Sequence, residues 1–342
     1  MKFAVFFLTG LLVFPAVAQK NWTASCLTNM SQLDDSFPGD VGIFVKSLSD
    51  GEICEFQADK RWYLASTIKI PVAIALLREV EKGQIDLQKK LTLKRSDYVD
   101  GSGDLLWQDP GKSFTVQHLL KNMLEQSDST ATDMLIGLMG VGTLNKTIHE
   151  LARDFAPLTT ILQVRYDAYG ELHPKAKTLT NMDFIELKKF PVAKRYEAFA
   201  KLIQVPVSEL KTASIEEAFE KYYARGLNST TLRSFGSLLE KLARGQVLNK
   251  AHTALVLKYM QEMKTGENRL KAGLPKDVVF AQKTGTQVAR MCNVGIAASK
   301  KKAQQKTVIV ACAEKYLDQA GAEKVLKKMA DALTEEGAFK NF

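Results

Sequence analysis

Strand-like segments occur near the two ends of this chain, and this placement constrains the fold more than any other feature. Residues 40–48 and 52–57 form two predicted strands joined by a turn at Ser49-Asp50-Gly51. Near the other end, strands are predicted at 278–282, 293–298 and 307–313, followed by a helix over 321–336. Strands from both ends can pair in one sheet, in which case the chain between them is an insertion into that sheet.

The intervening chain is predicted to be mainly helical. Apolar residues recur at helical spacing over 66–82, 116–125, 129–139, 142–152, 230–242 and 251–264. Residues 178–223 are predicted to be helical in pieces, interrupted at Pro191 and Pro206, whereas the irregular pattern of 159–174 predicts a loop. We therefore predict an α+β fold with three αβα layers, in which a mixed antiparallel sheet of N- and C-terminal strands carries an inserted all-helical lobe at about 66–265.

The first residues have the pattern of a secretory signal peptide. Lys2 gives a positive start, residues 3–13 are apolar, and Ala16-Val17-Ala18 fits a cleavage site. We expect residues 1–18 to be removed and the domain at 19–342 to be periplasmic or secreted. An oxidising compartment permits disulfides, although the sequence does not choose among the pairings of four cysteines. A hairpin turning near Lys302 would place Cys292 opposite Cys312, as a cross-strand bridge or as two facing buried thiols.

Composition restricts the partners that we expect. The formal net charge is +9, but the basic residues are spread along the chain and no nucleic-acid-binding motif accompanies them. No second apolar segment is long enough to span a membrane, and the histidines and cysteines do not have the spacing of metal ligands. We expect a monomer with no nucleic-acid partner, no metal and no cofactor.

Ser66-Thr67-Ile68-Lys69 opens the first long predicted helix. Residues three apart lie on one helix face, so the Lys69 amine is expected beside the Ser66 hydroxyl. Serine needs a neighbouring base to act as a nucleophile, and burial can lower the pKa of a lysine enough for that role. The same spacing recurs at Ser208 and at Ser299, but neither of these opens a long apolar helix.

Two further motifs carry candidate site residues. Ser127-Asp128-Ser129 lies between two predicted helices, where Ser127 can relay a proton and Asp128 can cap the following helix. Lys283-Thr284-Gly285-Thr286 follows a predicted strand, and a cation, a hydroxyl and a glycine there suit capture of a substrate carboxylate. A second K-T-G at Lys264 ends a helix, so we assign it a structural role.

In this order and context, the three motifs resemble those of the class A β-lactamases and penicillin-binding proteins. Residues 65–71 are similar to the family's nucleophile helix, Gly101-Ser102-Gly103 to a loop beside its site, and 266–286 to the strand of its last motif. The resemblance covers roughly residues 36–170 and 226–336. It implies that Ser66 attacks a β-lactam or cell-wall peptide carbonyl to form an acyl-enzyme.

The resemblance also implies roles for the remaining motif residues. Lys69 and Ser127 would transfer protons, and the backbone N–H groups of Ser66 and Thr286 would form the oxyanion hole. The substrate would be held by residues of two motifs: Ser129, Lys283, Thr284, Gly285 and Thr286.

The chain departs from the family pattern R-x-D-x-x-E-x-E-L-N, a loop whose first glutamate activates water in class A enzymes. Aligned from Arg165, the base position holds Gly170, and aligned back from Leu172 it holds Tyr169. Glu171 could therefore act as the base only after a shift of the loop by one residue.

Three more differences lie near this loop or in the middle motif. Asp133 replaces an Asn that contacts the glutamate in the family, and two carboxylates in contact would raise a pKa. Ser129 replaces another family Asn. Residues at about 174–224 form an extra helical insertion beside the loop.

Three functional hypotheses follow. The first, which we favour, is a divergent class A β-lactamase that forms an acyl-enzyme with β-lactam antibiotics and hydrolyses the lactam amide, with Ser66, Lys69, Ser127 and Glu171 as catalytic residues. The second is a penicillin-binding enzyme acting on D-Ala-D-Ala peptides, with slow release of the acyl group. The third is a non-catalytic envelope binding module, and the intact serine and lysine motifs argue against it.

Overall fold

The computed structural model describes residues 22–342, so the predicted signal peptide lies outside the described chain. Strands from both ends form one sheet in the order β2-β1-β9-β8-β7, and every neighbouring pair is antiparallel. The strands are β1 Asp40–Ser47, β2 Ile53–Phe56, β7 Val278–Gln287, β8 Arg290–Ser299 and β9 Lys306–Glu314. Strands β1 and β9 join the two ends of the chain, which confirms the predicted sheet.

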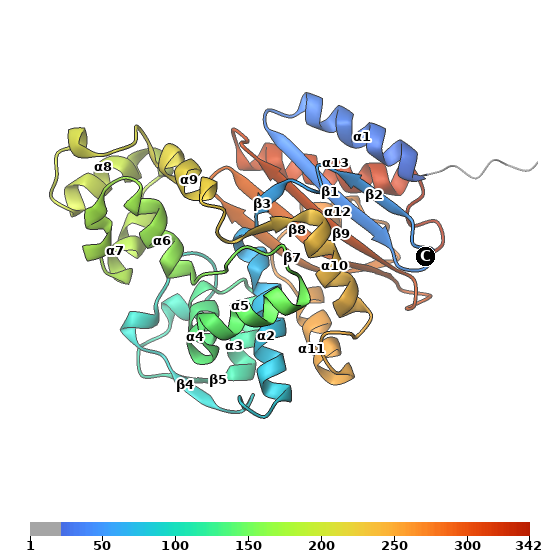
Figure 1. Cartoon of the computed structure of the whole chain (residues 1–342), viewed down its shortest axis with the longest axis horizontal. Helices are drawn as coiled ribbons and strands as arrows, with labels where there is room; N and C mark the ends of the chain where they lie inside the picture. The colour runs from blue at the N-terminus through green and yellow to red at the C-terminus, as the bar shows by residue number, and fades with distance from the viewer. Residues whose placement is uncertain (1–21) are drawn as a thin grey trace, which may run out of the picture.

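The sheet has a separate apolar core on each face. Along β9, Val308, Val310 and Cys312 enter one core, whereas the alternate residues Ile309 and Ala311 enter the other. Successive side chains of a strand point to opposite faces, so a strand buried on both faces has a continuous apolar sequence. Helices α1 (Trp22–Ser36), α12 (Leu270–Gly273) and α13 (Gln319–Glu335) lie on one side of the sheet (Figure 1), which gives the predicted three-layer arrangement.

The helical lobe packs on the opposite face (Figure 1). Its helices are α2 Lys69–Glu81, α3 Val116–Glu125, α4 Ser129–Met139, α5 Val141–Leu151, α10 Leu232–Ala243 and α11 Lys250–Gln261. Short 3₁₀ helices connect them at η1 Ala65–Ile68, η2 Arg95–Asp97 and η3 Leu105–Trp107. Two small sheets were not predicted: β3 Arg61–Tyr63 pairs with β6 Ser229–Thr231, and β4 Lys90–Thr92 with β5 Ser113–Thr115. The lobe is therefore mainly, rather than entirely, helical.

The extra segment forms a body of its own beside the lobe (Figure 1). Its elements are η4 Pro174–Thr178, α7 Asn181–Lys188, α8 Val192–Leu202, η5 Val207–Glu209 and α9 Ile215–Ala224. They pack with the preceding helix α6 (Ile161–Gly170) around an aromatic core that includes Tyr169, Phe184, Phe199 and Tyr222. The interruptions fall where Pro191 and Pro206 occur, as predicted.

The prediction of a loop over 159–174 is wrong, because α6 occupies most of it. Thr160 caps this helix by accepting a hydrogen bond from the backbone N–H of Gln163. The buried face includes Arg165 and Tyr169 as well as aliphatic residues, so the apolar periodicity that would reveal a helix is weak. Helix α1 was also missed. Among residues 22–342, no helix is both long and apolar enough to cross a membrane.

Both disulfides of the described chain are formed. Cys292 and Cys312 are register partners on β8 and β9 and are bridged, which settles the two interpretations left open by the sequence in favour of a disulfide. Cys26 on α1 is bridged to Cys54 on the edge strand β2. The two bridges lie in the two different cores of the sheet.

Candidate active site

Ser66 lies in the 3₁₀ helix η1, at the tight junction between strand β3 and helix α2. The preceding residue, Ala65, has a φ of 46°, a left-handed conformation that is unusual for a residue with a side chain. Strand β7 passes beside this turn. A Cβ on Gly285 would lie 2.5 Å from the Leu64 carbonyl oxygen and 3.0 Å from the Ser66 nitrogen. A glycine at 285 thus allows the strand to approach the start of the helix closely.

Lys69 is fully buried and points back to Ser66, as the spacing predicts. Its Nζ lies 3.1 Å from Ser66 Oγ and 3.1 Å from Ser127 Oγ, and it also donates to the Ser127 carbonyl oxygen. Burial lowers the pKa of Lys69 to about 7, although the carboxylates of Asp128 and Asp133 oppose this shift. A substantial fraction of Lys69 is therefore neutral near pH 7 and able to accept a proton from serine.

Ser127 is held in the left-handed region, with a φ of 59°, in the short connection between α3 and α4. Asp128 caps α4 through the backbone N–H of Ala131 and also accepts from the N–H of Leu105. The backbone N–H of Ser129 donates to the Ser102 carbonyl, so the 101–103 loop lies beside the motif. These contacts fix the position of the Ser127 hydroxyl.

Lys283 on β7 completes the polar cluster from the side of the sheet. Its buried Nζ lies 2.9 Å from Ser127 Oγ. Burial, and then repulsion from Lys69 and Arg269, holds the pKa of Lys283 well below its usual range. Ser127 therefore lies between two buried amines, both of which hold a proton less tightly than usual.

The neighbouring residues of the motif are fixed by side chains that the sequence did not place at the site. Thr284 Oγ1 lies 2.7 Å from Thr265 Oγ1, so the helix-ending K-T-G, to which we assigned a structural role, contacts the strand motif. Arg269 donates to Thr286 Oγ1 at 2.8 Å and pairs with Glu323 at 3.2 Å. These contacts hold the outer end of β7 beside Ser66.

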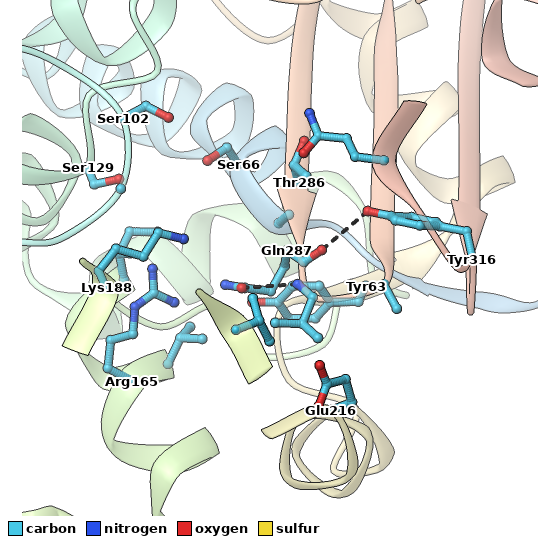
Figure 2. A pocket seen from close by; sticks show the side chains of 18 of the residues that line it. Tyr63, Ser66, Ser102, Ser129, Arg165, Lys188, Glu216, Thr286, Gln287 and Tyr316 are labelled. Carbon is cyan, nitrogen blue, oxygen red and sulfur yellow. Dashed lines mark hydrogen bonds between the residues drawn. The ribbon is translucent and has the colours of Figure 1, made fainter. Parts of the chain in front are cut away.

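A cavity of about 550 Å³ opens over Ser66 (Figure 2). Ser66, Ser102, Ser129 and Thr286 line it, so the structure brings the three sequence motifs to one place. Lys69, Ser127 and Lys283 lie in the buried layer behind this wall. Such a depression between two lobes, with converging polar groups, is typical of an enzyme site.

Glu171 is not among the residues that line this cavity. It lies at the C-terminal end of α6, partly exposed, with a carboxylate oxygen 3.7 Å from Arg225. The apolar side chain of Ile161, at the other end of α6, lines the cavity instead. The structure thus brings together every predicted site residue that the motifs contain, but it does not bring Glu171 to them.

Asp133 holds the N-terminal end of α6. Its two carboxylate oxygens accept the backbone N–H groups of Ile161 and Leu162 at 2.7 and 2.8 Å. Burial raises the pKa of Asp133 to about 6, and these two hydrogen bonds oppose the shift. The raised pKa therefore comes from burial rather than from a neighbouring glutamate.

Several cavity residues have no counterpart in the sequence prediction. They come from α6 and from the insertion: Ile161, Val164, Arg165, Lys188, Val192, Arg195 and Glu216. Their positions depend on how α6–α9 pack against the lobe, and no local motif signals such packing. The departure of the loop from the family pattern and the extra helical insertion at about 174–224 were the sequence features that indicated an unusual wall.

Fold and site together are those of a β-lactamase-like serine hydrolase. A family model described as the beta-lactamase enzyme family matches residues 27–336. The chain is 22% identical to beta-lactamase VEB-1 of Pseudomonas aeruginosa over 262 residues, covering 76% of this chain and 70% of that protein. It is 23% identical to a beta-lactamase of Mycobacterium tuberculosis over 268 residues, covering 77% and 69%.

Solved structures share the fold. PBP-A superposes with a TM-score of 0.70 at 19% identity, covering 93% of this chain and 97% of that one. A beta-lactamase from Sphaerobacter thermophilus superposes with a TM-score of 0.68 at 20% identity, covering 93% and 97%. A further structure of PBP-A, a mutant, is an acyl-enzyme complex with penicillin G. The chain belongs to the beta-lactamase enzyme family, and it is a β-lactamase-like serine hydrolase.

Proposed function

We propose that Ser66 is acylated by β-lactams and that the resulting ester is hydrolysed. One observation carries the acylation part of this proposal: Ser66 Oγ, Lys69 Nζ, Ser127 Oγ and Lys283 Nζ form a continuous series of groups with separations of 3.1, 3.1 and 2.9 Å. Each separation is within hydrogen-bonding distance, so a proton can pass along these four side-chain groups without movement of the backbone.

The chain of groups supports a balanced acylation step. Neutral Lys69 accepts the Ser66 proton as Ser66 Oγ attacks the lactam carbonyl carbon. When the lactam C–N bond breaks, Ser127 donates its proton to the leaving nitrogen and is reprotonated by the Lys69 ammonium group, which returns Lys69 to its neutral form. Negative charge on the carbonyl oxygen would be stabilised by the N–H groups of Ser66 and Thr286.

The second candidate is a penicillin-binding enzyme whose acyl-enzyme is long-lived. The apolar residue Ile161 at the cavity, together with the position of Glu171 outside it, favours this candidate. Hydrolysis of the ester needs a base beside the attacking water, and Ile161 provides none. The two candidates share the acylation step and differ in the rate of release.

We also propose that the protein is exported to the periplasm or secreted. The signal-peptide pattern at 1–18 motivates this proposal, and the two disulfides of the described chain support it, because such bridges persist in oxidising compartments. Detection of the protein, cleaved near Gln19, in a periplasmic or extracellular fraction would test it, and retention of an uncleaved chain in the cytoplasm would contradict it.

The test of acylation is a time course of intact protein mass after mixing with benzylpenicillin. We expect an adduct with the mass of the whole penicillin on Ser66, and its complete loss in Ser66→Ala. Ser208→Ala is a matched control, since exposed Ser208 has the same S-x-x-K spacing outside the cavity. Persistent labelling of Ser66→Ala would disprove the assignment of the nucleophile.

The lifetime of the adduct separates the two candidates. A short-lived adduct with continuing turnover, prolonged by Glu171→Gln, would support the first candidate and a role for Glu171. A stable adduct that Glu171→Gln leaves unchanged and Ile161→Glu shortens would support the second. Ile161→Glu places a carboxylate in the wall that lies beside Ser66.

A further inference from the structure

Two basic side chains of the insertion reach the cavity that contains Ser66. Lys188 is the last residue of α7 and Arg195 lies on α8, and both line the cavity. Figure 2 shows the Lys188 amine above Arg165, pointing into the cavity on the side of Ser129. The insertion therefore contributes positive charge to the substrate-facing wall.

Neither cation is neutralised by an acid within residues 22–342. The Lys188 side-chain amine has no hydrogen-bond or ion-pair partner in this part of the chain, and the Arg195 side chain donates only to the backbone carbonyls of Phe190 and Lys188. Arg165 differs, because its buried guanidinium pairs with Asp100 at 2.6 Å. Arg165 therefore serves the structure of the wall, whereas Lys188 and Arg195 keep their charge available.

The cations also repel one another. Desolvation, followed by the nearby Arg165 and Arg195, lowers the pKa of Lys188, whereas the carboxylate of Asp100 opposes the shift and part of the Lys188 side chain remains exposed. An anion placed among these groups would relieve that repulsion and form charge-assisted hydrogen bonds. Pairing these cations with an acidic side chain of the protein would have stabilised the fold more than leaving them unpaired. The arrangement therefore favours binding of an external anion.

The acidic residues of the cavity do not cancel this charge. Asp318 caps α13 by accepting a hydrogen bond from the Gly321 N–H. Glu216 lies on α9, and Figure 2 shows Glu216 at the far end of the cavity from Ser102. The wall is thus positive on the side of Lys188 and negative at the opposite end. A substrate that reaches α7 and α8 from Ser66 meets the positive part.

We propose that α7 and α8 add an anion-binding subsite to the acylation cavity, formed by Lys188 and Arg195. It would take a carboxylate carried on the acyl side chain of a β-lactam or peptide substrate, in addition to the carboxylate assigned to Lys283 and Thr284. This inference rests on the proposed acylation of Ser66, and it specifies the substrate class of that same site.

Three penicillins that share a phenylacetyl side chain provide the test: benzylpenicillin, carbenicillin with an added carboxylate, and ampicillin with an added amine. The measurement is the second-order rate constant of adduct formation for each. The unmodified protein should favour carbenicillin over ampicillin. In Lys188→Gln/Arg195→Gln, the ratio of the carbenicillin rate to the benzylpenicillin rate should fall about fivefold, as expected for loss of partly exposed charge pairs.

Lys189→Gln/Lys194→Gln is the matched control, since it removes the same charge from exposed positions of the same region outside the cavity. Its rate ratio should equal that of the unmodified protein. Added salt should reduce the preference in the unmodified protein and not in the Lys188→Gln/Arg195→Gln protein.

The outcomes are distinguishable. An unchanged ratio in Lys188→Gln/Arg195→Gln, or equal slowing with all three penicillins, would overturn the subsite while leaving acylation intact. Equal loss of preference in the Lys189→Gln/Lys194→Gln control would show that net charge, rather than a subsite, sets the ratio. Absence of an adduct with all three penicillins would overturn the acylation proposal and this inference with it.

Discussion

At the residue scale, the chemistry of the site depends on two buried amines that share one hydroxyl. Lys69 and Lys283 both contact Ser127 Oγ, and burial lowers the pKa of each. Two ammonium groups that contact the same hydroxyl repel each other, so the state in which Lys69 and Lys283 are both protonated is disfavoured. A proton can then be exchanged near pH 7 with little cost, which an isolated, solvated lysine could not do.

The pKa of about 7 at Lys69 predicts the pH dependence of acylation. The base form of Lys69 is the neutral amine, so the acylation rate at saturating benzylpenicillin should rise with pH and level off, with a midpoint near 7. Stopped-flow or quenched mass measurements between pH 5.5 and 8.5 would provide the profile. Lys69→Gln should lower the rate by at least about 100-fold, as expected for loss of a general base.

Saturating substrate is essential in this experiment, because it separates proton transfer from any effect of Lys283 on binding. A rate that is independent of pH over this range would exclude Lys69 as the titrating base. A rate that still rises steeply at pH 8.5, with no plateau, would show that Lys69 titrates as an exposed lysine and that burial does not lower its pKa.

Individual residues were predictable from sequence where a motif places them on one rigid element. Ser66 and Lys69 lie one turn apart, so helix geometry alone brings them together. Lys188 and Arg195 could not be predicted, because their relation to Ser66 depends on packing between separate elements. Glu171 illustrates the same limit, since its side chain lies at the end of α6 with Arg225.

At the scale of elements, helix α6 is anchored at its start by one titratable side chain. Asp133 on α4 accepts the first two N–H groups of α6, which have no partner within that helix. The anchor also sets the position of Ile161 in the cavity wall. The geometry of this wall is therefore linked to the protonation of Asp133.

Burial raises the pKa of Asp133 from 3.8 to about 6, so the folded protein binds this proton more tightly than the unfolded chain does. The resulting stability is fully present below pH 4 and is lost as the pH rises through 6. Relative to Asp133→Asn, the unmodified protein should lose up to roughly 3 kcal/mol of unfolding free energy between pH 4 and 7. Urea denaturation of both proteins across this range measures the difference.

Thr160→Ala is a control for this experiment, because it removes the cap of the same helix without removing a titratable group. It should cost about 1 kcal/mol at every pH. If the Asp133→Asn difference is constant with pH, Asp133 does not titrate in this window. If the unmodified protein instead gains relative stability as the pH rises, the N–H groups of α6 outweigh burial.

Helices and strands could be predicted from the sequence where their buried residues are apolar and follow the regular spacing of the element. Strand β9 has an apolar residue at almost every position because it is buried on both faces, and its segment was predicted correctly. Helix α1 buries only Trp22, Cys26 and Met30, and most of its other residues are polar, so the signal is weak. Helix α6 was missed because charged and aromatic residues share its buried face.

At the scale of the whole molecule, the sheet closes between segments that are far apart in the sequence. Strand β1 pairs with β9 along its full length, for example Asp40 with Glu314 and Ser47 with Thr307. The helical lobe and the insertion both lie in the sequence between these two strands. The site therefore lies where the inserted lobe meets the sheet. A fold with such long-range pairing is expected to form slowly, because the ends must meet before the sheet is complete.

The two disulfides lie on opposite faces of that sheet, so we expect their removal to affect the site differently. Each closes a loop of 20 to 28 residues, and loss of either should cost about 3 kcal/mol of unfolding free energy, measured by urea denaturation.

Cys292 lies in the core below the cavity, with its Sγ 3.5 Å from the Tyr63 carbonyl, and Tyr63 lines the cavity. We therefore expect Cys292→Ala/Cys312→Ala to slow acylation of Ser66 as well. Cys26→Ala/Cys54→Ala is the matched control on the far face, and it should lose similar stability while keeping its acylation rate. Equal acylation rates in the two double variants would show that the bridge between β8 and β9 stabilises the fold without positioning the site.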